Sequence, residues 1–303
     1  MATKILFKNV RKAIYKKKWP LIAVSLIIFL SAFIYTAMFL STDSISKSME
    51  SMMESNVAED FSIETVNMVL PDEVEKLDVD KLPESFNYSL TELSKMDIDV
   101  FENIVDCRID SITENYDAVN YELETRRYKD ISFGDSYQVR VYKDGKNINK
   151  TYLEEGEFPK TSYEIGLNKM FAENNNWSIG DNIEVLGKKY TITGFILYPD
   201  FNLPITNGEM LIDPDKKGIA MFSDDEFENI NGKEGFYLSG EYINCDEGEF
   251  QEKVIDEYKD NPIDVVSSIT LTKNQLRSGA IYEEISGGQA TMLGLSLFIA
   301  LIA

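Results

Sequence analysis

The chain has 303 residues, with 52 acidic residues against 30 basic ones, two cysteines and no histidine. A net charge of −22 argues against nucleic acid as a partner, because the phosphates would be repelled. The absence of histidine excludes His-based catalytic triads and His metal ligation. A hydrophobic content of 44% is enough to build folded cores, so the acidic part is not a disordered tail.

The first 18 residues are basic and hold seven Lys and Arg with no acidic residue. Wound into a helix, most of their apolar side chains fall on one side and most of the basic ones on the other. A helix of that kind lies in the membrane interface, so we expect residues 1–18 to form a cytoplasmic amphipathic helix. A loose basic tail is the alternative.

No charged residue lies between Lys18 and Asp43. A helix over this stretch would be roughly 30 Å long, which is one hydrocarbon thickness. Basic residues beside a span stay cytoplasmic, so the sequence predicts a transmembrane helix at 19–41 with the N-terminus inside and the following domain outside. A cleaved signal peptide fits less well, because the apolar stretch is too long and FLSTDS has no small-x-small cleavage site.

The helical pattern continues beyond the span as a predicted stalk helix over residues 42–59. Ile45, Met49, Met52 and Met53 share one face of this helix. Such a Met-rich face could contact a partner or ligand. Ordinary packing within the protein is the interpretation we favour.

Residues 60–271 alternate between short strand and helix patterns, which predicts an extracytoplasmic α+β domain. Strands are expected at 61–70, 107–113, 119–127, 137–143, 163–167, 182–186, 189–197, 218–222, 236–243 and 263–271, with an edge strand after residue 150. Helices are expected after a capping box formed by Ser89 and Glu92, over 168–174, up to Ile230 from a cap at Ser223 or Asp224, and over 247–259 with Asp246 as cap.

The end of the chain turns apolar again. Residues 272–286 are expected to form a helix leading back to the membrane, and residues 287–303 carry no charge. We therefore expect a second transmembrane helix that is cut short, and a chain that is the front portion of a longer protein.

The motifs of common enzyme chemistry are missing from the sequence. It contains no Walker-type phosphate-binding loop, no G-x-S-x-G elbow and no cysteine cluster for zinc. Asp224–Glu226 is interpreted as a solvated helix start in preference to a calcium site. Cys107 and Cys245 could pair in an oxidising exterior or remain separate thiols. We predict that the chain is not an enzyme and has no cofactor, no metal site and no catalytic residue.

The residue pattern of one segment has a structural explanation. This segment is YEIGLNKMFAENNNWSIGDNIEVLGKKYTITGFI. Its Gly-Asp step makes a tight turn into a strand, and Gly187 makes a hairpin turn. Joined to the membrane topology, this segment resembles the first portion of an FtsX-like/MacB-like ABC transporter permease. The residues that carry the resemblance are Glu164, Ile165, Lys169, Ala172, Glu173, Gly180, Asp181, Ile183, Gly187, Tyr190, Ile192 and Gly194.

The resemblance implies a MacB-like periplasmic core domain and a bacterial membrane protein. It further implies a separate cytoplasmic ABC ATPase subunit, a permease homodimer or heterodimer, and contact with membrane lipid. In such proteins the ATPase strokes pass through the membrane helices to the outer domain, a scheme called mechanotransmission, in export, efflux or other processes at the membrane surface. The acidic middle, about 71–149, matches no part of the pattern. The alternative is a transmembrane signalling receptor whose sensor domain lies between two spans.

Overall fold

The computed structural model describes residues 15–78, 82–134, 136–201, 213–275 and 277. The chain divides into two compact units: Met1–Ser51 together with Ile281–Ala303 forms one, and Met52–Ala280, here called the sheet unit, forms the other. The predicted α+β class is confirmed by the sheet unit. Most of the predicted interfacial helix and all of the predicted second span lie outside the described residues.

Helix α2 runs from Lys18 to Ser55. Within it, the segment Lys18–Ser41 is long and apolar enough to cross a membrane by length and composition alone. A signal sequence would meet the same test, but a core helix would be buried, and none of the apolar window is buried. Insertion of this helix in a membrane, and its direction, stay predictions.

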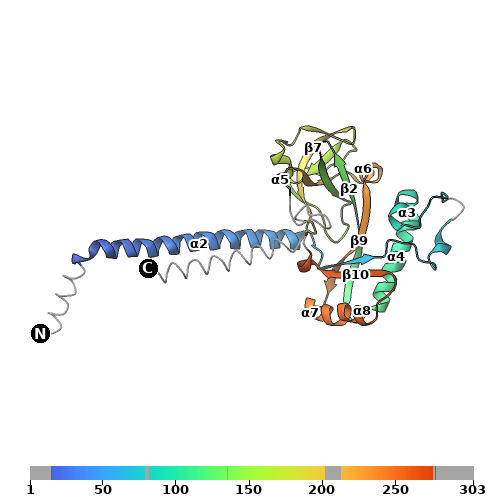
Figure 1. Ribbon diagram of the computed structural model, residues 1–303, viewed down its shortest axis with the longest axis horizontal. Helices are drawn as coiled ribbons and strands as arrows, with labels where there is room; N and C mark the ends of the chain where they lie inside the picture. The colour runs from blue at the N-terminus through green and yellow to red at the C-terminus, as the bar shows by residue number, and fades with distance from the viewer. Residues whose placement is uncertain (1–14, 79–81, 135, 202–212, 276, 278–303) are drawn as a thin grey trace. The chain divides into compact units, whose positions relative to one another are not determined.

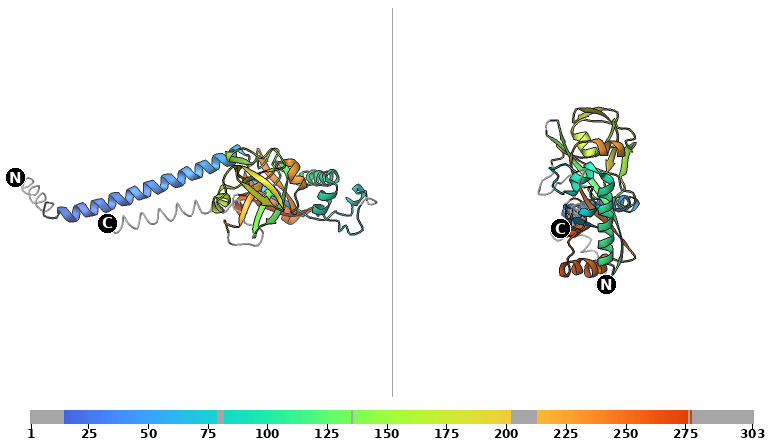
Figure 2. Two further views of the ribbon diagram at one scale, coloured as in Figure 1. Left: turned by 90° about the horizontal axis from the view of Figure 1, so that it is seen from above. Right: turned by 90° about the vertical axis from the view of Figure 1, so that its right-hand side faces the viewer.

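The sheet unit alternates helices and strands along the chain (Figures 1 and 2). Its described helices are α3 (Leu90–Met96), α4 (Ile98–Asn115), α5 (Lys169–Asn174), α6 (Asp224–Asn229), α7 (Glu247–Phe250) and α8 (Asp256–Asp260), with a π-helical turn at Gln251–Ile255. Its described strands are β1 (Phe61–Thr65), β2 (Asn120–Phe133), β3 (Tyr137–Tyr142), β4 (Tyr152–Gly156), β5 (Glu164–Leu167), β6 (Asn182–Val185), β7 (Lys188–Leu197), β8 (Lys217–Met221), β9 (Lys233–Ile243) and β10 (Val266–Leu271).

These described strands form one sheet in the order β10-β1-β9-β2-β3-β8-β5-β7-β4, and β6 pairs with β7. Most neighbours are antiparallel, whereas β3–β8 and β5–β7 are parallel. The antiparallel ladder of β2 and β9 runs from Asn120↔Ile243 to Asp130↔Lys233. Figure 1 shows β7 and α5 near one end of this ladder and α7 and α8 near the other, so β2 and β9 connect the two ends of the unit.

Each end has its own hydrophobic core. One core packs α4 and α7 against β1 and β9 around Phe61, Phe101 and Phe250. The other packs α5 and α6 against β5, β7 and β8. A smaller third cluster, rich in tyrosine, contains Tyr142, Tyr198, Phe201 and Tyr237. This third cluster surrounds the polar side chains that form the candidate site.

The segment that carries the family resemblance folds much as expected. Ile183, Val185, Tyr190 and Ile192 all point into the second core, which confirms their predicted inward alternation. The β6–β7 turn contains Gly187 at φ +81°, a conformation that glycine adopts without strain. A Cβ on Gly194 would lie 2.5 Å from the carbonyl oxygen of Glu157, so this position requires close backbone approach. These residues build a small β-rich module.

The predicted strand at 107–113 is wrong, because these residues belong to α4. Ile104, Val105, Arg108 and Ile112 are buried on one face of this helix, at the spacing of three to four residues that a helix requires. Arg108 forms an ion pair with Glu73, with a distance of 2.7 Å between Nη2 and Oε2, and its Nη1 and Nη2 also donate to the carbonyls of Val66 and Met68. The helix is therefore fixed by a buried arginine in addition to apolar packing.

The predicted capping box does not form. Ser89 is the N-cap residue of α3, but its side chain makes no capping hydrogen bond. Its hydroxyl contacts the Thr91 hydroxyl at 2.9 Å instead, and Glu92 accepts a hydrogen bond from the Asn87 amide. The Asp246 cap does form, since its Oδ1 accepts from the Glu249 amide at 2.8 Å. Of the predicted Met-rich face, Met52 and Met53 are buried in the sheet unit.

Candidate functional site

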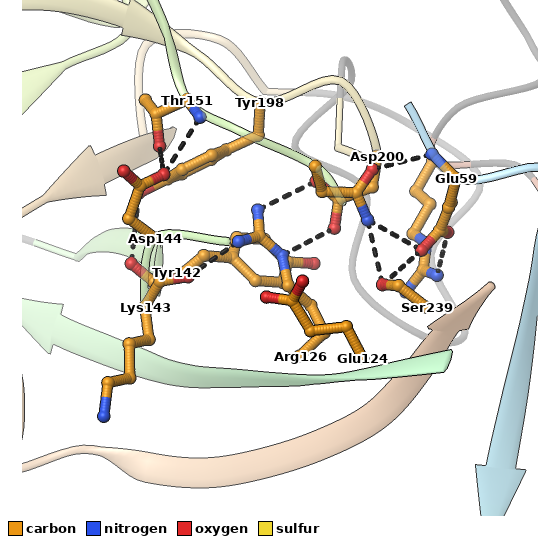
Figure 3. Close-up of polar contacts among 12 residues, drawn as sticks. Glu59, Glu124, Arg126, Tyr142, Lys143, Asp144, Thr151, Tyr198, Asp200 and Ser239 are labelled. Atoms are coloured by element: carbon orange, nitrogen blue, oxygen red, sulfur yellow. Dashed lines mark hydrogen bonds and ion pairs between the residues drawn. The ribbon is translucent and has the colours of Figure 1, made fainter. Parts of the chain in front are cut away.

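The most distinctive polar feature of the sheet unit is a buried network of charged side chains inside the tyrosine-rich cluster (Figure 3). It joins residues far apart in the sequence. Arg126 lies in the middle of β2, Asp200 follows β7, and Glu59 follows the end of α2. The chain therefore brings one charged group from each of three segments to the same place.

Arg126 and Asp200 form the centre of this network. Arg126 is 2% exposed and Asp200 is fully buried. The guanidinium donates from Nε and Nη2 to the two carboxylate oxygens at 3.1 and 3.0 Å, a bidentate geometry. Its Nη1 donates to the carbonyl of Lys143 at 2.6 Å, and its plane lies over the Tyr142 ring at 4.4 Å. Every nitrogen of this guanidinium therefore has a partner.

Glu59 forms the second centre, where the chain passes from α2 into β1. Its Oε2 accepts from the Ser239 hydroxyl at 2.7 Å and from the Asn149 amide at 2.9 Å. The Asn149 backbone amide in turn donates to the carbonyl of Val57 at 2.7 Å. The segment just beyond α2 is thus tied by its backbone and by a buried carboxylate to both β9 and the loop before β4.

Arg277, near the C-terminal end of the described chain, completes the network. Its Nη2 donates to Oε1 of Glu59 at 2.9 Å, and its guanidinium lies 4.0 Å from the centre of the Tyr237 ring. The Tyr237 hydroxyl donates to Asp200. One continuous set of contacts therefore runs from Arg126 to Asp200, Tyr237, Arg277 and Glu59.

Burial and neighbouring charges shift the pKa values of the Glu59 and Asp200 carboxyl groups in opposite directions. Burial raises the pKa of Glu59 above its ordinary value of 4.5, and the neighbouring Arg277 only partly offsets this effect. Burial also disfavours the charged form of Asp200, but the Arg126 guanidinium outweighs it and holds the pKa of Asp200 below 3.8. The Arg126–Asp200 pair is the firmly ionised part of the network, and Glu59 is the part closest to taking up a proton.

The contacts of this arrangement hold distant segments of the chain together. The two cavities described below and beside α6 are lined by other residues than Glu59, Arg126 and Asp200. The side chains bond to one another and to backbone groups, which holds segments together without presenting a reactive atom. Within the described ranges, no three Cys, Asp or Glu side chains are grouped so that they could hold a metal ion.

The residues singled out from the sequence lie elsewhere. Cys107 and Cys245 are both free thiols, the first on α4 and the second after β9. Glu226, from the acidic start of α6, accepts from Lys188 at 2.7 Å and from the Tyr190 hydroxyl. This carboxylate therefore fastens α6 to β7.

Sequence reasoning missed all members of the network. The sequence predicts a strand that ends at Arg127, whereas β2 continues to Phe133 and both Arg126 and Arg127 are buried. Two charged residues in the middle of an alternating strand were the available signal, because a buried charge requires a partner. Nothing in the sequence identified Asp200 as that partner.

Comparisons with known proteins do not identify a family for this chain. No protein family matches the sequence, and no curated protein matches it. Similar solved structures include a Bacillus anthracis protein classed as a lipoprotein, at 11% identity over 55% of this chain and 92% of that one, with a TM-score of 0.30. The periplasmic region of MacB from Actinobacillus actinomycetemcomitans matches at 9% identity over 58% of this chain and 81% of that one, also at 0.30. Likeness at this level carries no argument about function.

Proposed function

We propose that this chain belongs to an ABC transporter permease of the FtsX/MacB type, and that its sheet unit lies outside the cytoplasm. The apolar segment Lys18–Ser41, with seven basic residues over positions 1–18, supports a membrane anchor with an inside N-terminus. The β-rich module at 164–194 supports the family. The chain itself would not hydrolyse ATP; a cytoplasmic ATPase subunit would do so.

The observation that carries the coupling part of the proposal is the buried Glu59–Arg277 ion pair. Glu59 follows the helix that would cross the membrane, and Arg277 lies within the segment 272–286 expected to return to it. The pair reaches Asp200 and Arg126 through Tyr237. A movement of either membrane-linked segment would therefore be transmitted to β2 and β9 without passing through a flexible loop.

Affinity purification of the full-length protein from native membranes tests the class. We expect an ATP-binding subunit to co-purify, because the proposed mechanism requires one. Recovery of a histidine kinase without an ATPase would favour the signalling receptor. ATP hydrolysis by the purified permease alone would contradict the division of labour proposed here.

The coupling is tested in the same purified complex. Arg277→Gln should weaken stimulation of the ATPase by the permease while the complex still assembles, because the tie between the two segments is lost. Lys253→Gln is the matched control, since its ion pair with Glu249 is exposed and lies on the π-helical turn after α7. Equal ATPase stimulation in both variants would show that the ion pair only stabilises the fold.

A further inference from the structure

A cavity of about 350 Å³ lies against one face of the sheet, over β2, β3, β8 and β9. Its position follows from strand register, because Asp130 pairs directly with Arg140 on β3 and with Lys233 on β9. Residues directly opposite each other on neighbouring strands project to the same face. Strands β2, β3 and β9 therefore present a row of one acidic and two basic side chains to this cavity.

Arg140 is held rigidly at the wall of the cavity. It is 7% exposed, and its Nε and Nη2 donate to the Asp130 carboxylate at 2.7 and 2.8 Å. The guanidinium lies between two aromatic rings, with 4.1 Å to the centre of Tyr128 and 5.0 Å to the centre of Phe201. A side chain fixed in this way loses little conformational entropy when a ligand binds.

The third guanidinium nitrogen remains available. Nη1 of Arg140 has no hydrogen-bond partner anywhere in the described part of the chain. Lys233 is exposed at the edge of the same cavity and makes no ion pair with a described residue. Ser132 and Gln138 add uncharged polar groups to the same lining. The cavity is thus lined by hydrogen-bond donors of both charged and uncharged side chains.

The local charge runs against that of the whole molecule. The chain carries a net charge of −22, yet the described lining contains three basic side chains (Arg140, Lys217 and Lys233) against two acidic ones. One of the two acidic residues, Glu234, is bound by Arg127 through Oε1 at 2.6 Å. Basic groups gathered in a concave site raise the local concentration of anions. The rest of the surface is acidic and repels anions, so the site differs from its surroundings in charge.

We propose that this cavity binds a small oxyanion, a phosphate or carboxylate group, with Arg140 as the anchoring cation and Lys233 as a second charge at the rim. The planar guanidinium suits an oxygen of such a group, and the volume suits a small ligand. The group could belong to a soluble ion or metabolite, or to the headgroup of an anionic lipid.

Calorimetric titration of the full chain in an uncharged detergent, at constant ionic strength set with chloride, tests the proposal. Inorganic phosphate and acetate serve as the soluble probes, and short-chain phosphatidylglycerol serves as the lipid probe with phosphatidylcholine as its reference. We expect at least one anionic probe to bind. Arg140→Gln should weaken that binding about tenfold or more, since a charged hydrogen bond is lost. Lys233→Gln should weaken it a few-fold.

Lys189→Gln is the matched control, because Lys189 is an exposed lysine on β7 that does not line the cavity. It should leave affinity unchanged. If Arg140→Gln fails to fold, Lys233→Gln carries the test alone. Lys233 is exposed, so replacing its side chain should leave the protein folded. The proposal is overturned if no anionic probe binds, or if Lys233→Gln and Lys189→Gln bind as tightly as the unaltered protein. A response to phosphate or acetate assigns a soluble ligand, and a response to phosphatidylglycerol alone assigns a lipid headgroup.

Discussion

Two arginine–aspartate pairs share strand β2 but have different surroundings. In both, a bidentate guanidinium lies over a tyrosine ring. The Arg126–Asp200 pair is closed, because the last arginine nitrogen bonds to the Lys143 carbonyl and Asp200 also accepts from Tyr237. The Arg140–Asp130 pair is open, because Nη1 faces no partner among the described residues and the Asp130 side chain is 32% exposed.

The difference between them indicates two roles for the same chemistry. A closed pair can only be broken at a large cost, because each charge left alone is buried. An open pair keeps one unused hydrogen-bond donor and lies next to solvent, so it can accept a ligand without losing its internal bonds. Mutation should therefore separate the two pairs by stability and by binding.

The largest effect is expected for Arg126→Met. This change leaves Asp200 charged and buried, so we expect the free energy of unfolding to fall by about 3–5 kcal/mol. Urea unfolding of the full chain in detergent, followed by the fluorescence of Trp177 in a Trp19→Phe background, measures it. Trp177 packs edge-on against Tyr137 and Phe171, so its emission reports the second core.

A double variant sharpens this result. Arg126→Met combined with Asp200→Leu replaces both charges by apolar groups and should recover much of the loss, because no unpaired charge remains buried. A double variant as unstable as Arg126→Met would show that packing around the tyrosines, and not the ion pair, was disturbed.

The second largest effect is expected for Asp200→Asn, and it should depend on pH. Because the folded protein holds the pKa of Asp200 below its ordinary value of 3.8, the ionised carboxylate favours folding. That contribution is complete above pH 3.8 and is lost as the pH falls through the lower folded-state pKa. We expect a loss of about 3 kcal/mol at pH 7 that shrinks towards pH 3. A loss independent of pH would mean that Asp200 is not the ionised partner.

Much of this fold could be predicted from the sequence, and the reason is local. The β6–β7 hairpin has alternating apolar residues and glycine at its turn, and Asp246 caps its helix as expected. These features depend on neighbours in the chain. Strand β2 shows the limit, because Arg126 and Arg127 look like solvent-facing residues until partners from distant segments are known.

The same limit explains why none of these arginine–carboxylate pairs was predicted. Arg126 meets Asp200 across 74 positions in the sequence, and Glu59 meets Arg277 across 218. No periodicity or motif connects such residues, because their contact depends on the order of the strands in the sheet. The Arg140–Asp130 pair is closer in sequence, but its meaning depends on the cavity beside it.

A smaller effect is expected for Asp130→Asn. The change leaves Arg140 without its charged partner, but the Asp130 side chain is partly exposed, so solvent replaces some of the lost interaction. We expect the free energy of unfolding to fall by about 1 kcal/mol in the same urea experiment. A loss as large as that of Arg126→Met would show that the Arg140–Asp130 pair is closed after all.

The smallest effect is expected for Lys233→Gln, and it is the most informative. Lys233 is exposed and makes no ion pair with a described residue, so its removal should change the free energy of unfolding by less than about 0.5 kcal/mol. If the cavity beside Arg140 binds an anion, the same variant should still weaken that binding. An unchanged stability with weaker binding separates recognition from structure, which Arg140→Gln alone cannot do, because Arg140 serves both. A large loss of stability would instead show that Lys233 stabilises the fold, and the Arg140–Asp130 pair could then no longer be distinguished from the Arg126–Asp200 pair by binding alone.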